Sequence, residues 1–143
     1  MYSEDQYEEF SNKMESKFPE MYDGKYGGFC IDAGWWPIIE ALSSQIDSYT
    51  KWRNNTRAAL KKDNPYNHKI PKAVPQVKVM QIKEKFGGLR FYCHGADDYI
   101  YGMIDFAEKI STRICEECGN PGKLIKSDTG WLHTACEEHK RNE

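Results

Sequence analysis

The strongest chemical signal in the chain lies in its last thirty residues, where three cysteines and one histidine form two close pairs. The first pair is Cys115 and Cys118, and the second is Cys136 and His139. The members of each pair are separated by two residues and the pairs by 17 residues, which are spacings typical of zinc sites. Three thiolates and one imidazole fill a tetrahedral shell and leave no position for water. The sequence therefore predicts a structural Zn²⁺ site.

The residues between the ligand pairs are typical of a small folded metal module. Glycines follow the first pair, and a polar turn at residues 127–130 separates two short apolar stretches. We expect a knuckle, a hairpin and a short helix whose first turn carries Cys136 and His139, which together resemble a treble clef. His133 is the alternative imidazole ligand, but its place in a predicted strand favours a packing role.

Length and composition indicate one domain with a modest core, or one domain with a small zinc module attached. The chain has 143 residues, of which 39% are hydrophobic, 13% aromatic and 29% charged. Aromatic side chains must therefore supply much of the packing. No apolar run reaches the length of a membrane span, and the acidic N-terminus is unlike a targeting segment. We expect a cytoplasmic protein, in a compartment that keeps thiols reduced.

Charge is distributed unevenly along the chain. Residues 1–48 contain three Lys against ten Asp or Glu, and residues 49–95 contain eleven Lys or Arg against two acidic residues. Residues 96–143 contain six basic and ten acidic residues. The basic middle is able to meet an anionic partner, or it neutralises the acidic flanks of the same molecule, and both interpretations stay open.

Hydrophobic periodicity and capping signals predict an α+β fold. A capping box at Ser3 opens a first helix that ends before Pro19. Pro37 opens a second helix that continues toward residue 60. Prolines and polar residues then make residues 61–76 an exposed connection.

The pattern changes to that of strands in residues 77–93. Polar residues alternate there with β-branched or aromatic ones, and Gly87 and Gly88 divide the segment, which predicts a hairpin. We expect both glycines to supply positive φ at its turn. An aspartate then caps a third helix over residues 98–114 that leads directly into the first metal ligand.

These elements predict two parts. Residues 1–114 should form an α+β domain in which amphipathic helices pack on the hairpin. Residues 115–143 should form the treble-clef-like zinc module. No internal repeat or low-complexity tract interrupts either part.

Residues in and near the hairpin are candidates for binding an anion. Lys85 and Arg90 flank the glycine turn, whose backbone N–H groups lack side-chain bulk, as in loops that hold a phosphate. Aromatic faces nearby would stack on a base, with a gain of about 1–3 kcal/mol per base. The candidate ligand-binding residues are Trp35, Trp36, Lys85, Gly87, Gly88, Arg90 and Tyr92. A plain hairpin turn and ordinary core aromatics are the alternative interpretation.

The sequence contains no recognisable catalytic set. It lacks His-Glu-x-x-His and nucleophile-elbow motifs, and the glycine turn lacks the Gly-Lys-Ser/Thr of a P-loop. His94, beside Asp97 and Asp98, is the best acid–base candidate, but a surface histidine at a strand end explains it as well. We therefore predict a binding protein with no catalytic residues.

One stretch of the chain resembles a known family. Residues 81–92 read QIKEKFGGLRFY, and an acidic helix and the cysteine–histidine module with its Gly130-Trp131 pair follow them. This combination, with the Gly34-Trp35 helix start, resembles a family of small, largely uncharacterised proteins of tailed bacteriophages and prophages. The resemblance implies a cytoplasmic protein of an infected bacterial cell that carries a structural zinc. Small phage proteins commonly act on host machinery or host defence, which is an association and no mechanism.

Two functions follow as expectations. The first is a phage-type counter-defence or host-takeover protein that binds an anionic ligand, either a signalling nucleotide or a nucleic acid strand, through its basic centre and hairpin. The second is a protein–protein inhibitor or adaptor that binds a host protein through the acidic first helix or the aromatic loop before residue 37. The basic block, glycine turn and aromatics converge in one third of the chain, which favours the first. No membrane partner is expected, and self-association stays open.

Overall fold

The structure is a computed structural model that describes residues 1–63 and 69–142, and it confirms an α+β fold with three α-helices and two small sheets among those residues. In chain order the elements are α1 (Glu4–Lys17), β1 (Phe29–Cys30), the 3-10 helix η1 (Ala33–Trp35), α2 (Trp36–Asp63), β2 (Lys78–Lys85), β3 (Gly88–His94), α3 (Asp98–Ser111), β4 (Lys123–Lys126) and β5 (Leu132–Ala135). The predicted connection over residues 61–76 lies partly outside the described residues. No helix in the described ranges is both long and apolar enough to span a membrane.

The predicted helix starts are present. The Ser3 side chain accepts a hydrogen bond from Gln6 N, and the Gln6 side chain accepts one from Ser3 N, which completes the capping box of α1. Asp97 caps α3 by accepting from Ile100 N at 2.9 Å. Because each cap satisfies otherwise unpaired N–H groups, local sequence alone fixes where these helices begin.

The main sheet has the strand order β1–β2–β3. The predicted hairpin is confirmed, since β2 and β3 pair antiparallel, with a bulge between Val79 and Gln81. Strand β1 lies in the stretch expected to be loop and pairs parallel with β2, placing Phe29 beside Ile82. Two residues are too few to show a periodicity, so this strand depends on its partner across the sheet.

The hairpin turn differs from the prediction. Its two central residues are Phe86 and Gly87, with φ of 53° and 82°, while Gly88 is already the first residue of β3. A two-residue turn that matches the twist of its strands needs positive φ at both central positions. The expectation that both glycines supply positive φ is therefore wrong, because the first of these positions belongs to a phenylalanine.

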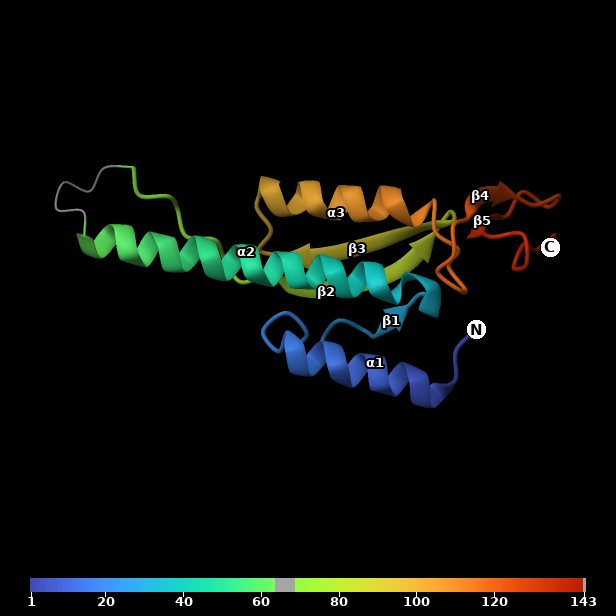
Figure 1. Cartoon of the computed structure of the whole chain (residues 1–143), viewed down its shortest axis with the longest axis horizontal. Helices are drawn as coiled ribbons and strands as arrows, with labels where there is room; N and C mark the ends of the chain where they lie inside the picture. Colours follow the sequence, from blue (N-terminus) through green and yellow to red (C-terminus); the bar gives the residue numbers. More distant parts are fainter. Residues whose placement is uncertain (64–68, 143) are drawn as a thin grey trace.

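Helices α2 and α3 lie side by side over the main sheet, and α1 packs along α2 and β1 (Figure 1). Aromatic rings fill the space around α1: Phe10 stacks on Trp36 at 4.7 Å between ring centroids and meets the edge of Phe29 at 4.8 Å. Trp35 is fully buried. The core thus leans on aromatics, as the composition predicts.

The C-terminal region is a second, two-stranded sheet in which β4 pairs antiparallel with β5. After β5, residues 137–139 form a turn in which His139 N donates to Cys136 O at 3.2 Å. The short helix predicted to carry Cys136 and His139 is therefore absent from residues 115–142, because one tight turn already returns the histidine to the cysteine. A treble-clef arrangement is not confirmed.

Candidate metal centre and basic sheet face

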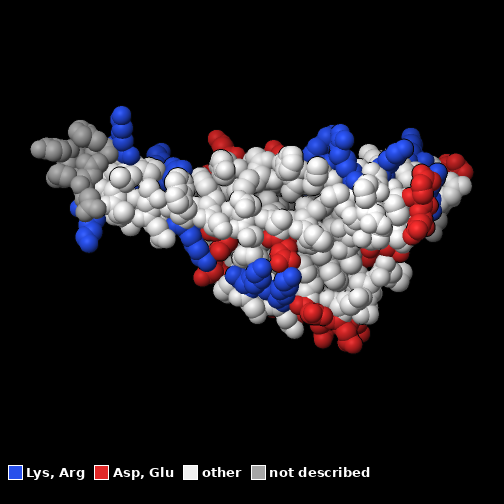
Figure 2. Space-filling view, in the orientation of Figure 1, with Lys and Arg blue, Asp and Glu red and all other residues white. Residues whose placement is uncertain are grey.

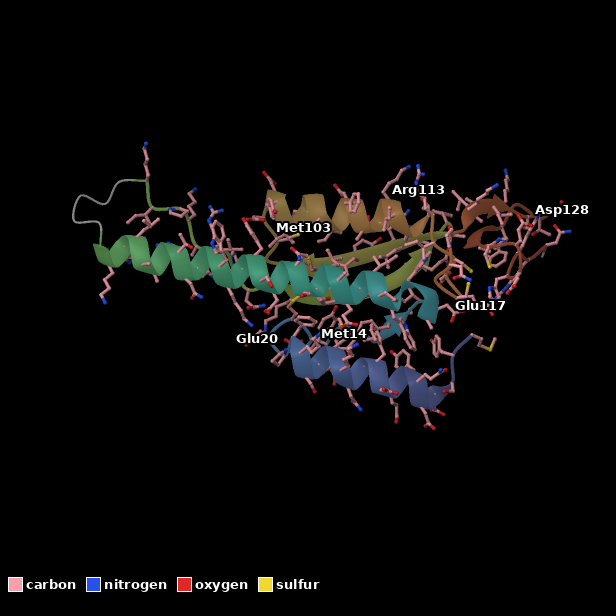
Figure 3. All side chains as sticks on the ribbon, in the orientation of Figure 1. Met14, Glu20, Met103, Arg113, Glu117 and Asp128 are labelled. Atoms are coloured by element: carbon pink, nitrogen blue, oxygen red, sulfur yellow. The ribbon has the colours of Figure 1, made fainter. Side chains whose placement is uncertain are left out.

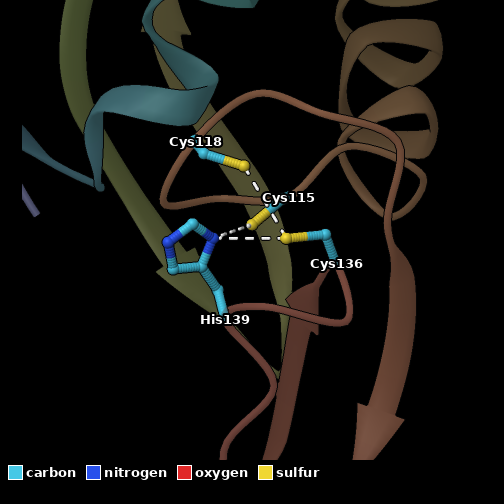
Figure 4. A group of neighbouring side chains, drawn as sticks. All are labelled: Cys115, Cys118, Cys136 and His139. Carbon is cyan, nitrogen blue, oxygen red and sulfur yellow. Dashed lines mark hydrogen bonds between the residues drawn. The ribbon is translucent and has the colours of Figure 1, made fainter.

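The four predicted metal ligands point toward one another (Figure 4). Their ligand atoms lie within 4.8 Å of each other. The Sγ atoms of Cys118 and Cys136 are 3.7 Å apart, and His139 Nδ1 lies 3.2 Å from Cys136 Sγ and 3.7 Å from Cys115 Sγ. A tetrahedral ion with metal–sulfur distances of ~2.3 Å and metal–nitrogen distances of ~2.0 Å separates its ligands by ~3.5–3.8 Å. The group is therefore shaped to hold a metal ion.

The fold brings the two ligand pairs together through the small hairpin. Cys115 and Cys118 lie in the turns after α3, and Cys136 follows β5. The ladder between β4 and β5 ends with Lys123 opposite Ala135, next to the second pair. All cysteines of the chain are free, so no disulfide competes for these sulfurs.

Local backbone geometry prepares Cys115 to bind a cation. Burial alone would raise the pKa of its thiol, but the backbone N–H groups of Cys136, Cys118 and Glu117 donate to the sulfur and bring the pKa down to about 7. Metals bind the thiolate, so a lowered thiol pKa reduces the cost of losing the proton on binding.

A carboxylate lies behind the histidine ligand. Glu117 Oε1 is 3.8 Å from His139 Nε2, and the other oxygen of Glu117 accepts from Arg141 at 3.2 Å. Figure 3 places Glu117 at the end of the molecule that carries the metal ligands. A carboxylate in this position holds the ring so that Nδ1 presents its lone pair to the metal. His133 lies outside the ligand group: it is buried and accepts from Arg141 N at 3.1 Å.

Hydrogen bonds to backbone carbonyls join the ligand region to the helical body. Gly34 N donates to Glu116 O at 2.6 Å, and Trp35 Nε1 donates to Ile114 O at 2.8 Å. A Cβ on Gly34 would lie 2.2 Å from the carbonyl oxygen of Cys115, so only glycine permits this approach. The division predicted at residue 114 stays a prediction.

The outer face of the β2–β3 hairpin gathers basic side chains. Paired residues of antiparallel strands point to the same side of the sheet. The pairs Ile82–Phe91 and Glu84–Leu89 face the helices, so the intervening pairs face away from them. We call the outward set the open sheet face; it consists of Lys78, Lys83, Lys85, Arg90, Tyr92 and His94.

Most of the charge on the open sheet face is not neutralised. Lys83 lies opposite Arg90, and neither these two nor Lys85 has an ion-pair partner within the described ranges. Lys78 lies 3.7 Å from Asp23 at the edge of the face. Tyr92, opposite Gln81, is 43% exposed and offers its ring to solvent. The face therefore combines cations with an aromatic surface.

The turn and the tryptophans predicted to bind a ligand are engaged in the fold. Gly87 is buried, and its N–H donates to Glu84 at 2.7 Å, so it is not free to cradle a phosphate. Gly88 is also buried and belongs to the β2–β3 ladder. Trp35 has no exposed surface, and the ring of Trp36 is covered by Phe10. The prediction that Trp35, Gly87 and Gly88 hold a ligand is corrected on this ground, because core packing and strand pairing occupy their surfaces, whereas the ligand role of the half-buried Trp36 stays a prediction.

Sequence reasoning missed Lys78 and Lys83 as members of the face. Alternation along β2 marks them as outward residues, but only the register shows which of them lie beside Arg90 and Tyr92. His94, the acid–base candidate, is exposed at the end of β3, whereas Asp97 accepts from Ile100 N and Tyr49 Oη.

Comparison of the chain with protein-family models, with curated proteins and with solved structures found no match. The resemblance to phage proteins therefore stays a prediction.

Proposed function

We propose that the protein carries a structural zinc ion and binds single-stranded nucleic acid on its open sheet face. The proposal rests on the cations of this face that have no ion-pair partner among the described residues. They lie on both strands of the hairpin, and the exposed ring of Tyr92 lies among them. Proteins that bind single strands commonly combine a basic surface with aromatic rings on which bases stack.

The extent of the open sheet face favours a strand of nucleic acid over a single nucleotide. Lys78 and Lys85 are the two ends of β2, and strands rise ~3.3 Å per residue, so these cations are separated by about 23 Å. Several successive phosphates would be needed to meet all of them. A signalling nucleotide would engage only part of the face.

Zinc is the metal that the donor set favours. Thiolates and imidazole select soft or borderline ions, and a closed set of four such ligands is typical of structural zinc. In this role the ion supplies folding energy and no chemistry. The proposed function is accordingly binding without catalysis.

The test is fluorescence anisotropy of labelled single-stranded oligonucleotides across a range of salt concentrations. Affinity should fall as salt rises, with a slope of about −0.7 for each phosphate contact. Changing Lys83 and Arg90 together to Ala should flatten the slope by about 1.4. Tyr92→Ala should weaken binding by about 1–3 kcal/mol.

The β4–β5 hairpin offers a control that removes the same amount of charge. Lys123 and Lys126 are both exposed and lie outside the open sheet face. Changing both to Ala should leave the slope nearly unchanged. Binding that is insensitive to salt, or equal losses in the two double variants, would contradict the proposal, and binding of mononucleotides alone would identify the ligand as a nucleotide.

A second candidate function is inhibition of a protein by α1. The first two turns of α1 carry Glu4, Asp5, Glu8 and Glu9, and all four side chains are exposed. Figure 2 shows acidic side chains gathered over this part of the surface. Such a surface suits a basic protein partner. A stable complex that survives removal of the cations on the open sheet face, and is lost when these acidic residues are replaced by Gln or Asn, would favour this function.

The counter-defence role is proposed on the resemblance alone. The observation that would support it is a growth advantage that the protein gives to an infecting phage. That advantage should disappear with the Lys83 and Arg90 double variant if nucleic acid binding is its basis.

A further inference from the structure

An apolar groove of about 840 Å³ runs between α2 and α3. Ile38 and Ala41 line it from α2, and Met103, Phe106 and Ile110 line it from α3. Figure 2 shows this part of the surface uncharged and hollowed, and in Figure 3 Met103 lies between the two helices. Large exposed apolar patches of this kind mark contact surfaces.

Two residues of α3 stand out along this groove. Phe106 is 68% exposed, an unusual state for a large apolar ring. Gly102 lies one turn earlier, and apart from its chain neighbours and the backbone of its own helix, no described atom lies within 4 Å of the place where its Cβ would be. A glycine inside a helix lowers its stability relative to alanine, and the fold of this chain gives no steric reason for one here. A group arriving from outside supplies that reason.

We propose that α3 pairs antiparallel with α3 of a second copy of the chain, so that Phe106 of each copy lies over Gly102 of the other. The contact is isologous, because the protruding ring and the vacant position belong to the same helix and are exchanged by one two-fold axis. The axis crosses the exposed side of α3 midway between Gly102 and Phe106. In this register each Phe106 enters the other copy's groove next to Met103.

The charges of α3 favour the antiparallel direction. Its first turn carries Asp98 and its middle carries Asp105, whereas its last turn carries Lys109 and Arg113 follows its end (Figure 3 labels Arg113). Among the residues that the structure describes, none of these four is in an ion pair. The antiparallel register sets Lys109 opposite Tyr99 and beside Asp98 of the second copy. A parallel pair would instead align like charges.

The contact is small, which sets its expected strength. A helix of 14 residues is about 21 Å long. A contact made by one helix of this length and the groove residues of α2 buries an area near the lower limit of specific interfaces. The dimer should therefore dissociate at concentrations on the order of micromolar.

Sedimentation velocity of the metal-loaded full chain, from about 1 to 200 µM, tests the proposal. The wild type should shift from monomer to dimer with concentration. Phe106→Glu should weaken association by at least about tenfold, because it places a charge in an apolar contact. Gly102→Leu should weaken it to a similar degree by filling the vacant position, while leaving the helix intact.

Three further single variants and one double variant keep the result specific. Tyr101→Glu is the matched control, since Tyr101 is exposed on the same helix but does not line the groove, and it should leave association unchanged. Asp98→Lys and Lys109→Asp should each weaken association a few-fold, and their combination should restore it, because the ion pair is then reversed.

The thermal unfolding of each variant, measured at a concentration where the wild type is monomeric, separates loss of contact from loss of fold. A wild type that stays monomeric throughout, even if another protein occupies the groove, would overturn the proposal. So would a dimer that forms equally well with Phe106→Glu.

Discussion

The described residues before Cys115, here called the body, and residues 115–142, here called the C-terminal hairpin, bury very different kinds of surface. The body has a continuous core of aromatic and aliphatic side chains, with Trp35, Phe29 and Met14 among its most buried members. In residues 115–142 the only buried apolar side chains are Cys115 and Ala135, and both belong to or adjoin the metal ligands. The hydrophobic effect is therefore able to fold the body, whereas the hairpin has too little apolar burial to fold alone and would need a metal ion at its ligand group or contacts with the body.

The largest effect should come from breaking the metal centre. Cys136→Ser removes one ligand, and structural zinc sites in small modules contribute ~10–16 kcal/mol of apparent binding free energy, which is also folding energy. We expect residues 115–142 to become protease-sensitive and zinc to be lost, while the body keeps a cooperative unfolding transition. Limited proteolysis with metal analysis measures both.

The control for this change is Cys30→Ser, because Cys30 is exposed and lies outside the ligand group. It should behave like the wild type. A Cys136→Ser protein with full thermal stability and an intact hairpin would show that a metal ion does not stabilise the hairpin.

The next largest effect should come from the close backbone contact between Gly34 in the body and the first ligand pair of the hairpin. A Cβ on Gly34 would lie 2.2 Å from Cys115 O and 2.4 Å from Glu116 O, both backbone atoms that are unable to move alone. Gly34→Ala should cost about 3 kcal/mol, at the upper end of typical overpacking penalties, and should also weaken metal binding. Urea denaturation measures the loss.

Gly102→Ala is the matched control for Gly34→Ala. Its Cβ would meet open space, so in the monomer it should raise stability by about 0.5–1 kcal/mol. Equal effects at the two glycines would mean that the contact at Gly34 is looser than the structure shows.

A smaller effect is expected behind the histidine ligand. Glu117→Gln weakens the contact with His139 Nε2 and should reduce metal affinity about 10–100-fold without unfolding the protein. A competition titration with a chelator measures this ratio. Glu138→Gln serves as the comparison, since Glu138 is exposed and pairs with none of the described cations. Metal affinity equal to that of the wild type would remove Glu117 from the site.

The smallest effect lies on the surface of the body, where Glu40 of α2 accepts from Lys13 and Lys17 of α1. The hydrogen bond from Lys13, aided by that from Lys17, lowers the pKa of Glu40 below its ordinary value of 4.5. A lowered folded-state pKa stabilises the protein above that ordinary value, and the contribution is lost as the pH falls through the folded-state pKa.

Glu40→Gln should therefore cost at most about 1 kcal/mol at neutral pH and nothing in acid. Thermal unfolding of the two proteins from neutral to acidic pH measures the difference. A gap that widens as the pH falls would contradict the sign of the pKa shift.

The metal ligands and helix caps were predictable because a short local sequence pattern identifies each of them. Spacing identifies the four ligands, and the side chain of Ser3 or Asp97 bonds only a few residues ahead. These signals need no knowledge of the rest of the fold.

The parts that sequence reasoning missed depend on distant partners. Strand β1 exists because it pairs with β2 some fifty residues later, and Gly87 is buried because the hairpin of the metal region lies against it. The composition of the open sheet face depends on a register that includes a bulge. The sequence alone makes Trp35 a candidate for stacking, but in the fold it is fully buried and donates to Ile114 O in the segment after α3.

The measurement that tests the central claim most directly is X-ray absorption at the zinc edge of protein purified without added metal. The proposed zinc site predicts one zinc per chain with three sulfur neighbours at ~2.3 Å and one nitrogen at ~2.0–2.1 Å. An unchanged spectrum after Glu138→Gln and a loss of bound zinc after Cys136→Ser would support that assignment. A zinc-free protein with a Cys118–Cys136 disulfide, or a zinc with oxygen neighbours, would contradict it.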